Sequence, residues 1–156
     1  MIAVIQRVSF ARVEVDSKIV GQIGPGLLVL LGISTNDDSP QSDFLVSKIS
    51  QLRIFSDLEG KMNKSVLDLG LEVLVVSQFT LLADASQGNR PSYIKAARPE
   101  KAIPLYEYFC NSLEKRIEKP VQKGIFGADM KVHLLNDGPV TIVLDTDSIM
   151  KKKQIL

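Results

Sequence analysis

Hydrophobic positions in the first part of the chain predict strands. Residues 2–10 and 11–15 are rich in valine and isoleucine, and a polar turn separates them from a returning strand over residues 19–23. Gly24-Pro25-Gly26 then breaks the chain, and residues 27–33 are continuously apolar. A strand without polar alternation is typical of a sheet covered on both faces, so we expect residues 27–33 to form the central strand.

Two later segments have the period of amphipathic helices. Ser39-Pro40 is a helix-start signal, in which the serine hydroxyl can accept from a free backbone amide and proline is preset for the first turn. Leu45, Ile49 and Leu52 follow at i, i+4 and i+7 and predict one buried face. A second helix is expected over residues 99–118. Its buried face is expected to consist of Ile103, Tyr106, Cys110, Leu113 and Ile117.

The remaining segments predict further strands and one long loop. A hairpin is expected near residues 53–63, a second buried strand over 72–77, and two closing strands over 130–135 and 140–144. Residues 78–98 show no clear period and contain several Gly, Pro, Ser and Asn residues. Irregular segments of that length are uncommon in compact domains unless they serve a function, so we expect this loop to belong to a site.

Composition favours one ordinary globular domain over residues 1–156. The chain is 45% apolar and 24% charged, which excludes disordered, collagen-like and rod-like proteins. Its formal net charge of +1 provides no overall field that would attract a polyanion. Any contact with nucleic acid therefore has to be local.

The amino terminus and the single cysteine favour a soluble protein of the cytoplasm. Arg7, Arg12 and Glu14 place charges where a signal peptide would be apolar, and the longest apolar run is far shorter than the roughly 20 residues that cross a bilayer. We therefore expect no membrane partner. Cys110 is alone, which excludes a disulfide within the chain and a multi-cysteine metal site. Because Cys110 falls on an expected buried helix face, we expect it to pack rather than react.

The inventory of residues excludes several mechanisms. His133 is the only histidine and falls within an expected strand, so a histidine-dependent triad is not indicated. No set of ligands recurs at metal-binding spacing, and neither glycine-rich phosphate-binding motif is present. We therefore expect neither a metal nor an organic cofactor.

Ser77-Gln78-Phe79-Thr80-Leu81 is a polar cluster at the end of an expected buried strand. One interpretation is a strand edge whose hydroxyls cap local backbone groups. The other is a segment that presents consecutive backbone amides to an oxyanion, with the Ser77 and Thr80 hydroxyls nearby. Neither hydroxyl is acidic enough to attack without a neighbouring base, so the second interpretation favours polarisation by the backbone and attack by water.

Asn136-Asp137-Gly138-Pro139-Val140-Thr141 lies between the two closing strands. Asp-Gly is a strong hairpin signal, so an ordinary turn is the simpler interpretation. A cis peptide bond before Pro139 would instead mark a retained feature. Gly24-Pro25 is an equally good dipeptide, and the sequence leaves open which bond is cis.

Residues 77–84 (SQFTLLAD) and 136–141 (NDGPVT) together resemble the two signature motifs of the D-aminoacyl-tRNA deacylases. The resemblance spans essentially the whole chain. Its other matching segments are residues 5–8, 61–63, 89–92 and 124–130. It implies a three-layer α/β/β single domain with mixed, barrel-like sheets, which forms a homodimer with the active site at the subunit interface. It also implies hydrolysis of the ester that joins a D-amino acid, or glycine mischarged on tRNA(Ala), to the 3′ end of tRNA.

The resemblance also implies roles for individual residues. Gly138 and Pro139 match the cis dipeptide that reaches into the partner subunit's site and excludes L side chains, and Arg7 matches the residue that holds it. The catalytic segment is implied to be Ser77, Gln78, Phe79 and Thr80, with backbone amides around the scissile carbonyl and Thr80 in a positioning role. Phe126 and Met130 match positions near the bound amino acid. Under this scheme the ribose 2′-hydroxyl of the substrate assists the attacking water.

Alternative functions stay open. The same fold could proofread glycine or an L-amino acid, which a trans bond before Pro139 would favour. A nucleic-acid-binding module or replication accessory protein is the non-enzyme alternative, against which the weak basicity and the lack of an aromatic row speak. The Lys151-Lys152-Lys153 tail is most simply a solvated end. Contacts with tRNA phosphates are expected from local cations, namely Lys61, Lys64, Arg90, Lys95 and Arg98.

Overall fold

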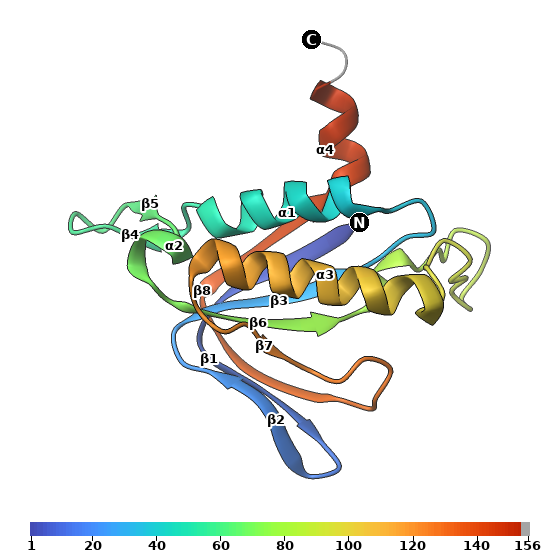
Figure 1. Cartoon of the computed structure of the whole chain (residues 1–156), viewed down its shortest axis with the longest axis horizontal. Helices are drawn as coiled ribbons and strands as arrows, with labels where there is room; N and C mark the ends of the chain where they lie inside the picture. The colour runs from blue at the N-terminus through green and yellow to red at the C-terminus, as the bar shows by residue number, and fades with distance from the viewer. Residues whose placement is uncertain (154–156) are drawn as a thin grey trace.

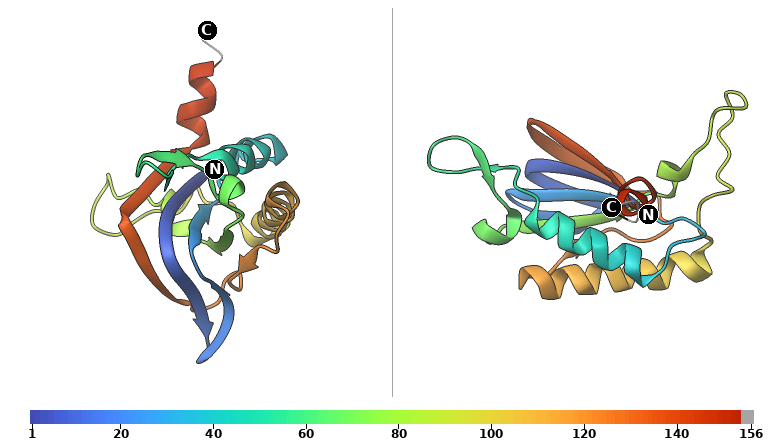
Figure 2. Two further views of the ribbon diagram at one scale, coloured as in Figure 1. Left: turned by 90° about the vertical axis from the view of Figure 1, so that its left-hand side faces the viewer. Right: turned by 90° about the horizontal axis from the view of Figure 1, so that it is seen from above.

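A curved mixed sheet is covered on one face by two helices, as Figure 1 and Figure 2 show. The computed structural model describes residues 1–153. In chain order the elements are β1 (Ile2–Val15), β2 (Lys18–Ile23), β3 (Gly26–Gly32), α1 (Ser39–Gln51), β4 (Phe55–Ser56), β5 (Met62–Lys64), α2 (Val66–Leu69), β6 (Glu72–Ser77), the 3₁₀ helix η1 (Phe79–Leu82), α3 (Pro99–Ile117), β7 (Gln122–Lys123), β8 (Lys131–Asp145) and α4 (Thr146–Lys153).

The first three strands form one long hairpin. β1 is a continuous strand that pairs with β3 through its first half and with β2 through its second half. The register is the same in both halves, since Val8 lies opposite Gly26 and Ala11 opposite Ile23. The returning arm is interrupted at Gly24-Pro25, where the sequence predicted a break, and its pairing with β1 shifts by one residue between Val13 and Glu14.

The other strands extend this hairpin into a nearly closed barrel. β6 lies parallel to β3, β7 lies parallel to β6, and β8 pairs antiparallel along the other edge of β1. The two ends of the path β2-β1-β3-β6-β7 approach each other closely, because a Cβ atom on Gly21 of β2 would lie 2.5 Å from the Lys123 carbonyl oxygen of β7. The predicted α/β fold with a barrel-like sheet is confirmed.

Two hydrophobic cores lie on opposite faces of the sheet. Leu27 and Val29 of β3 belong to the core under α1 and α3, whereas Leu28 belongs to the core on the other face. All three side chains are fully buried, and each such burial stabilises the fold by roughly 1.5–3 kcal/mol. The prediction of a central strand covered on both faces is therefore confirmed.

The helices agree with the sequence pattern except at particular positions. α3 ends one residue before the expected boundary and buries Cys110 as predicted, but Ile103 is 41% exposed and does not belong to the buried face. At the start of α1 the capping residue is Asp38 rather than Ser39. The Gln41 side chain accepts a hydrogen bond of 3.0 Å from the Asp38 amide, which supplies a local cap that the Ser39 prediction missed.

The predicted turn at residues 136–139 is wrong. The two closing strands are one strand, β8, which follows the same edge of β1 throughout. Gln6 pairs with Thr141 and Val8 with Asn136, so residues 137–140 bulge out opposite Arg7. The Asp-Gly hairpin signal is overridden here because both flanking segments already have their pairing partner in β1.

The loop expected over residues 78–98 contains more structure than its sequence suggested. It begins with η1, and two isolated bridges then join Asp84 to Ser92 and Ser34 to Ala96. The segment between η1 and α3 projects from the body of the domain, as the right-hand view of Figure 2 shows. The short elements α2 and β7 and the terminal α4, where Lys151 is exposed, were also not predicted. No helix within residues 1–153 is long and apolar enough to cross a membrane.

The close approach of β3 to β6 generates a stability prediction. A Cβ atom at Gly26 would lie 1.9 Å from the Glu72 carbonyl oxygen, whereas one at Gly24 would meet only a side-chain oxygen at 3.6 Å. We expect Gly26→Ala to lower the free energy of unfolding by about 1–3 kcal/mol because the backbones must separate. Gly24→Ala is the matched control and should change it by less than about 0.5 kcal/mol. Equal melting temperatures of the two variants would contradict this account.

Candidate active site

A pocket of about 250 Å³ opens where the chain leaves β6. One wall comes from the end of β6 and the start of η1, and the other from the segment that leads into β8. The lining residues are Val76, Ser77, Gln78, Phe79, Phe126, Gly127, Ala128, Asp129, Met130 and Val132. Five of the predicted site residues, Ser77, Gln78, Phe79, Phe126 and Met130, thus meet around one cavity although about 50 positions separate the two segments in the sequence.

The sheet fixes the direction in which the chain enters this pocket. The Gln78 amide donates a 2.8 Å hydrogen bond to the Leu31 carbonyl and so prolongs the ladder between β3 and β6 by one step. η1 then folds back over β3, which Gly32 permits: a Cβ atom there would lie 2.6 Å from Leu82 Cδ2 and 3.0 Å from the Gln78 carbonyl oxygen. This fit places η1 directly beside the pocket.

Backbone amides in this segment differ in their availability. The Gln78 amide is already used by Leu31. The Phe79 and Thr80 amides have no hydrogen-bond partner within residues 1–153. Two consecutive donors are therefore available to an acceptor at this end of the pocket, as expected of an oxyanion site.

Thr80 has no base beside its hydroxyl. The recorded partner of its Oγ1 in the described part of the chain is Gln78 Nε2, which donates and cannot take a proton. His133, the single histidine, lies on β8, and its Nε2 is 3.3 Å from Oε2 of Glu14 on β1. The arrangement does not activate Thr80 as a nucleophile.

The Phe126 wall rests on buried residues of α3. The Phe126 ring packs edge-on against Tyr106, with ring centroids 6.0 Å apart. The Tyr106 hydroxyl donates a 2.8 Å hydrogen bond to the Val75 carbonyl of β6, and burial raises the pKa of this hydroxyl. Tyr106 therefore joins Phe126 to β6, so that both walls of the pocket share one support.

Met130 lies against the backbone of the opposite turn. A Cβ atom at Gly124 would lie only 2.5 Å from the Met130 sulfur, so the missing side chain makes room for it. Sequence reasoning matched Met130 and Phe126 to a site but did not identify Gly127, Ala128, Asp129 or Val132. It also missed the contact between Phe79 and Tyr93, whose centroids lie 5.0 Å apart. No periodic signal in the sequence marks these lining residues.

The bulge in β8 is the second predicted constellation. Arg7 holds it from β1: its Nε donates to the Asp137 carbonyl at 3.0 Å and its Nη1 donates to the Ile54 carbonyl at 2.7 Å. On the other side, the Asn136 side chain accepts from the Val140 amide at 3.0 Å. The Gly138–Pro139 peptide bond is cis, and within the described residues it is the one cis bond recorded, which answers the choice left open with Gly24-Pro25.

The pocket and the bulge lie at different places along the sheet. Ser77 pairs with Leu31, and Leu31 pairs with Ala3, whereas the bulge lies opposite Arg7. Along β1, Ala3 at the level of the pocket and Arg7 at the level of the bulge are four residues apart, which corresponds to about 13 Å. Arg7, Gly138 and Pro139 are accordingly absent from the pocket lining of this chain.

The cations predicted to contact tRNA lie on two separate segments of the chain. Arg90, Lys95 and Arg98 lie on the segment between η1 and α3, whereas Lys61 and Lys64 lie on or beside β5. Lys61 is already paired with Glu59 at 3.1 Å. Among residues 1–153, no group of three or more His, Cys, Asp or Glu side chains could hold a metal ion.

Comparisons with known proteins agree on one family. A family model described as D-Tyr-tRNA(Tyr) deacylase matches residues 4–145. The chain is 58% identical over 146 residues to the D-aminoacyl-tRNA deacylase of Porphyromonas gingivalis, with 94% of this chain and 97% of that protein covered. It is 53% identical over 149 residues to the D-aminoacyl-tRNA deacylase of Thermosipho melanesiensis, with coverage of 96% and 99%.

Solved structures show the same fold. One described as "c-Myc DNA Unwinding Element Binding Protein" is 45% identical with a TM-score of 0.87, and the match covers 93% of this chain and 98% of that one. Another, described as "Structural Analysis of a probable eukaryotic D-amino acid tRNA deacylase", has a TM-score of 0.80 at 17% identity, with coverage of 92% and 98%. At that identity the second match shows likeness of fold alone.

The buried support of the pocket can be tested through Cys110. Burial raises the pKa of its thiol to about 12, so the thiol stays protonated at pH 8 and reacts slowly. We expect the native protein to resist alkylation by iodoacetamide at pH 8 and the unfolded protein to be labelled at the ordinary rate, as measured by intact mass. Labelling of the native protein as fast as the unfolded one would contradict the burial of Cys110.

Proposed function

The chain belongs to the D-Tyr-tRNA(Tyr) deacylase family, and from this membership we propose that it hydrolyses the ester bond of D-aminoacyl-tRNA in the cytoplasm. The products are the free D-amino acid and tRNA. The observation that supports this proposal most directly is the pocket beside Phe79 and Thr80, whose two amides are unpartnered in the described part of the chain. Glycine mischarged on tRNA(Ala) is proposed as a further substrate, since it has no side chain to be rejected.

The chemistry rests on the backbone rather than on a nucleophilic side chain. Water attacks the ester carbonyl, and the developing oxyanion accepts hydrogen bonds from the Phe79 and Thr80 amides. One such donor contributes about 10²–10³-fold to a rate. The bond to the ribose 3′ oxygen then breaks, and this oxygen takes a proton. Because Thr80 has no base at its hydroxyl, the substrate's own 2′-hydroxyl relays the proton from water to the leaving oxygen.

Chirality is read by backbone atoms of a second copy of the chain. Since Gly138 and Pro139 lie about 13 Å along the sheet from the pocket of their own chain, they act in the pocket of a partner subunit within a homodimer. A fixed main-chain wall against one face of the α-carbon rejects any L side chain without selecting among D side chains. The hydrogen bonds from Arg7 support this role because they tie the bulge to β1 and to Ile54.

The tRNA partner is held mainly through its aminoacylated 3′ end. With a formal net charge of +1, the chain offers only local phosphate contacts. Arg90, Lys95 and Arg98 are suited to them, since they lie on the segment whose Tyr93 contacts Phe79 of the pocket. Such an enzyme reads the terminal adenosine and its ester and makes few contacts with the rest of the tRNA.

A second candidate function is DNA binding. It is favoured by one observation, the name of the 45% identical solved relative, which describes that protein as binding a DNA unwinding element. The two functions separate experimentally, because a DNA-binding module would bind duplex or single-stranded DNA without hydrolysing any aminoacyl ester.

Matched D-Tyr-tRNA, L-Tyr-tRNA and Gly-tRNA test the proposed function. We expect rapid hydrolysis of the D and glycyl esters and sparing of the L ester. Gly138→Ala should reduce the ratio of D to L rates by about tenfold or more, because Gly138 has φ +137° and an added Cβ atom would lie 2.7 Å from Val140 Cγ2.

Gly60→Ala is the matched control for this substitution. Gly60 also has a positive φ, +78°, but an added Cβ atom there meets nothing within 4 Å. It should leave the D to L ratio unchanged. Equal hydrolysis of D and L esters by the unaltered protein, or hydrolysis of none, would refute the proposed function.

A substrate with a 2′-deoxy terminal adenosine tests the proton relay. Removing this hydroxyl should slow hydrolysis by about 10²–10⁴-fold, whereas Thr80→Val, which keeps the backbone amide, should remain within about tenfold of the unaltered rate. Single-turnover rates measure both effects. A normal rate on the deoxy substrate, or loss of all activity in Thr80→Val, would show that Thr80 rather than the substrate supplies the hydroxyl.

A further inference from the structure

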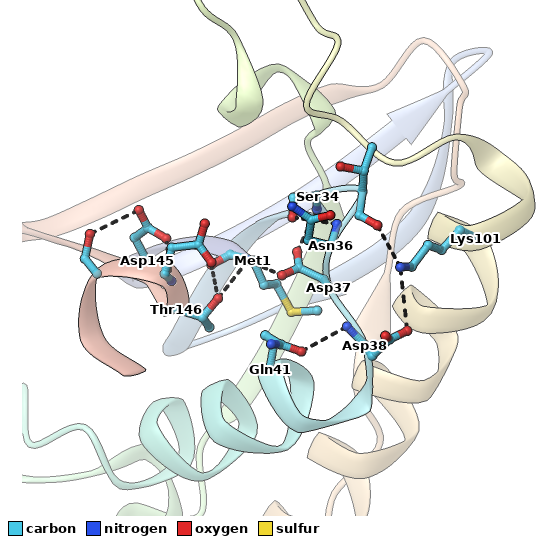
Figure 3. A network of polar contacts seen from close by, with 12 residues as sticks. Met1, Ser34, Asn36, Asp37, Asp38, Gln41, Lys101, Asp145 and Thr146 are labelled. Atoms are coloured by element: carbon cyan, nitrogen blue, oxygen red, sulfur yellow. Dashed lines mark hydrogen bonds and ion pairs between the residues drawn. The ribbon is translucent and has the colours of Figure 1, made fainter. Parts of the chain in front are cut away.

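The α-ammonium of Met1 is buried within the domain, whereas the ammonium at a chain end is usually exposed to solvent. Figure 3 shows that it is held by side chains from two other segments. Its nitrogen donates to Asp37 Oδ1 at 2.6 Å and to Thr146 Oγ1 at 2.8 Å. The Met1 side chain is 0% exposed and the Asp37 side chain 2% exposed, so water cannot replace either partner.

The partners of this ammonium are themselves anchored. The second oxygen of Asp37 accepts from the Ser34 amide at 2.6 Å. The Thr146 amide donates to the Met1 carbonyl at 3.0 Å, which fixes the first residue of α4 against the start of β1. One charged amine therefore joins three segments that are far apart in the sequence: the start of β1, the turn before α1 and the start of α4.

This network also supports the projecting segment between η1 and α3. Ile33 and Thr35, which flank Ser34, are paired with that segment: the Ala97 amide donates to the Ile33 carbonyl at 2.9 Å, and the Thr35 amide donates to the Lys95 carbonyl at 3.0 Å. A shift of the turn at Asp37 would therefore be transmitted to the chain beside the pocket.

Capping the amine would change both its charge and its hydrogen bonding. An N-formyl or N-acetyl group turns the ammonium into a neutral amide with a single N–H, which cannot serve Asp37 and Thr146 together. Asp37 would then be a buried carboxylate without its counter-charge, which is strongly unfavourable. The added carbonyl would also need space beside Met1, whose side chain belongs to the main core.

We propose that the α-amine of Met1 is a modification-sensitive site and that the domain closes only around its uncapped, charged form. For a chain that starts with N-formylmethionine, hydrolytic deformylation then precedes folding. In that step water adds to the formyl carbon, the C–N bond breaks, formate leaves and the amine takes up a proton. The proposal concerns folding and does not depend on the substrate of the pocket.

The test compares the full chain carrying free Met1 with the same chain carrying formyl-Met1. Both are made by cell-free translation, the second with the lysate's deformylase inhibited, and intact mass identifies the two forms. We expect formyl-Met1 to lower the melting temperature by about 10 °C or to make the chain insoluble while the free form folds. Melting temperatures within about 1 °C of each other would overturn the proposal.

Asp37 and Asp38 provide the matched controls. Asp37→Asn removes the buried counter-charge, so the free and formylated forms of that variant should differ by less than the unaltered pair differ. Asp38→Asn changes a neighbouring carboxylate that is 76% exposed, and it should leave the effect of formylation intact. If formylation lowers the melting temperature of Asp37→Asn as much as that of the unaltered chain, the effect is steric and the charge-based proposal is wrong.

Discussion

Pairing of β1 along both of its edges determines where every group of the proposed site lies. One edge carries β3 and β2 in one antiparallel register as far as Val13, and the other carries β8. Neither edge can slip, because a shift of one residue would turn Ala3 and Ile5 away from the main core. The extra residues of β8 are therefore accommodated opposite Arg7, where they form the bulge that carries Gly138 and Pro139, and a second, smaller register shift follows between Val8 and Phe10 of β1.

The same pairing separates the two halves of the proposed chemistry. β3 carries the register of β1 to β6, so the chain leaves the sheet at Ser77, at the level of Ala3 rather than Arg7. A rigid sheet cannot bring the bulge to its own pocket. A homodimer offers a direct solution, since a bulge and a pocket on different subunits can meet without distortion of either. The proposed division of labour, with hydrolysis by amides of one chain and chiral rejection by the other, follows from this separation.

Sequence patterns predicted the fold where local and long-range preferences agree. The central strand, both long helices and the packing of Cys110 could be found because apolar periodicity and burial coincide there. The continuity of β8 could not be found, because the local hairpin preference of Asp137-Gly138 yields to pairing with a strand more than 120 positions earlier. In the pocket, Phe126 and Met130 could be named only through a family resemblance. The free amides of Phe79 and Thr80 lie in the segment for which consecutive donors were one of two interpretations, and the sequence alone did not decide between the two. Gly127 and Ala128 are small residues without a periodic signal, so the sequence did not mark them.

Hybrid dimers provide the most direct test of the claim that the bulge of one subunit completes the pocket of the other. One subunit carries Gly138→Ala, with its own pocket intact, and the other carries Ala128→Trp, which fills the pocket but keeps its bulge. We predict that the Ala128→Trp homodimer is inactive and that the Gly138→Ala homodimer hydrolyses esters with a lowered D to L ratio. The hybrid should hydrolyse D-Tyr-tRNA with the unaltered D to L ratio, because its one open pocket meets the intact bulge of the subunit whose own pocket is filled. A hybrid whose D to L ratio is as low as that of the Gly138→Ala homodimer, measured with purified two-tag dimers, would contradict the cross-subunit account.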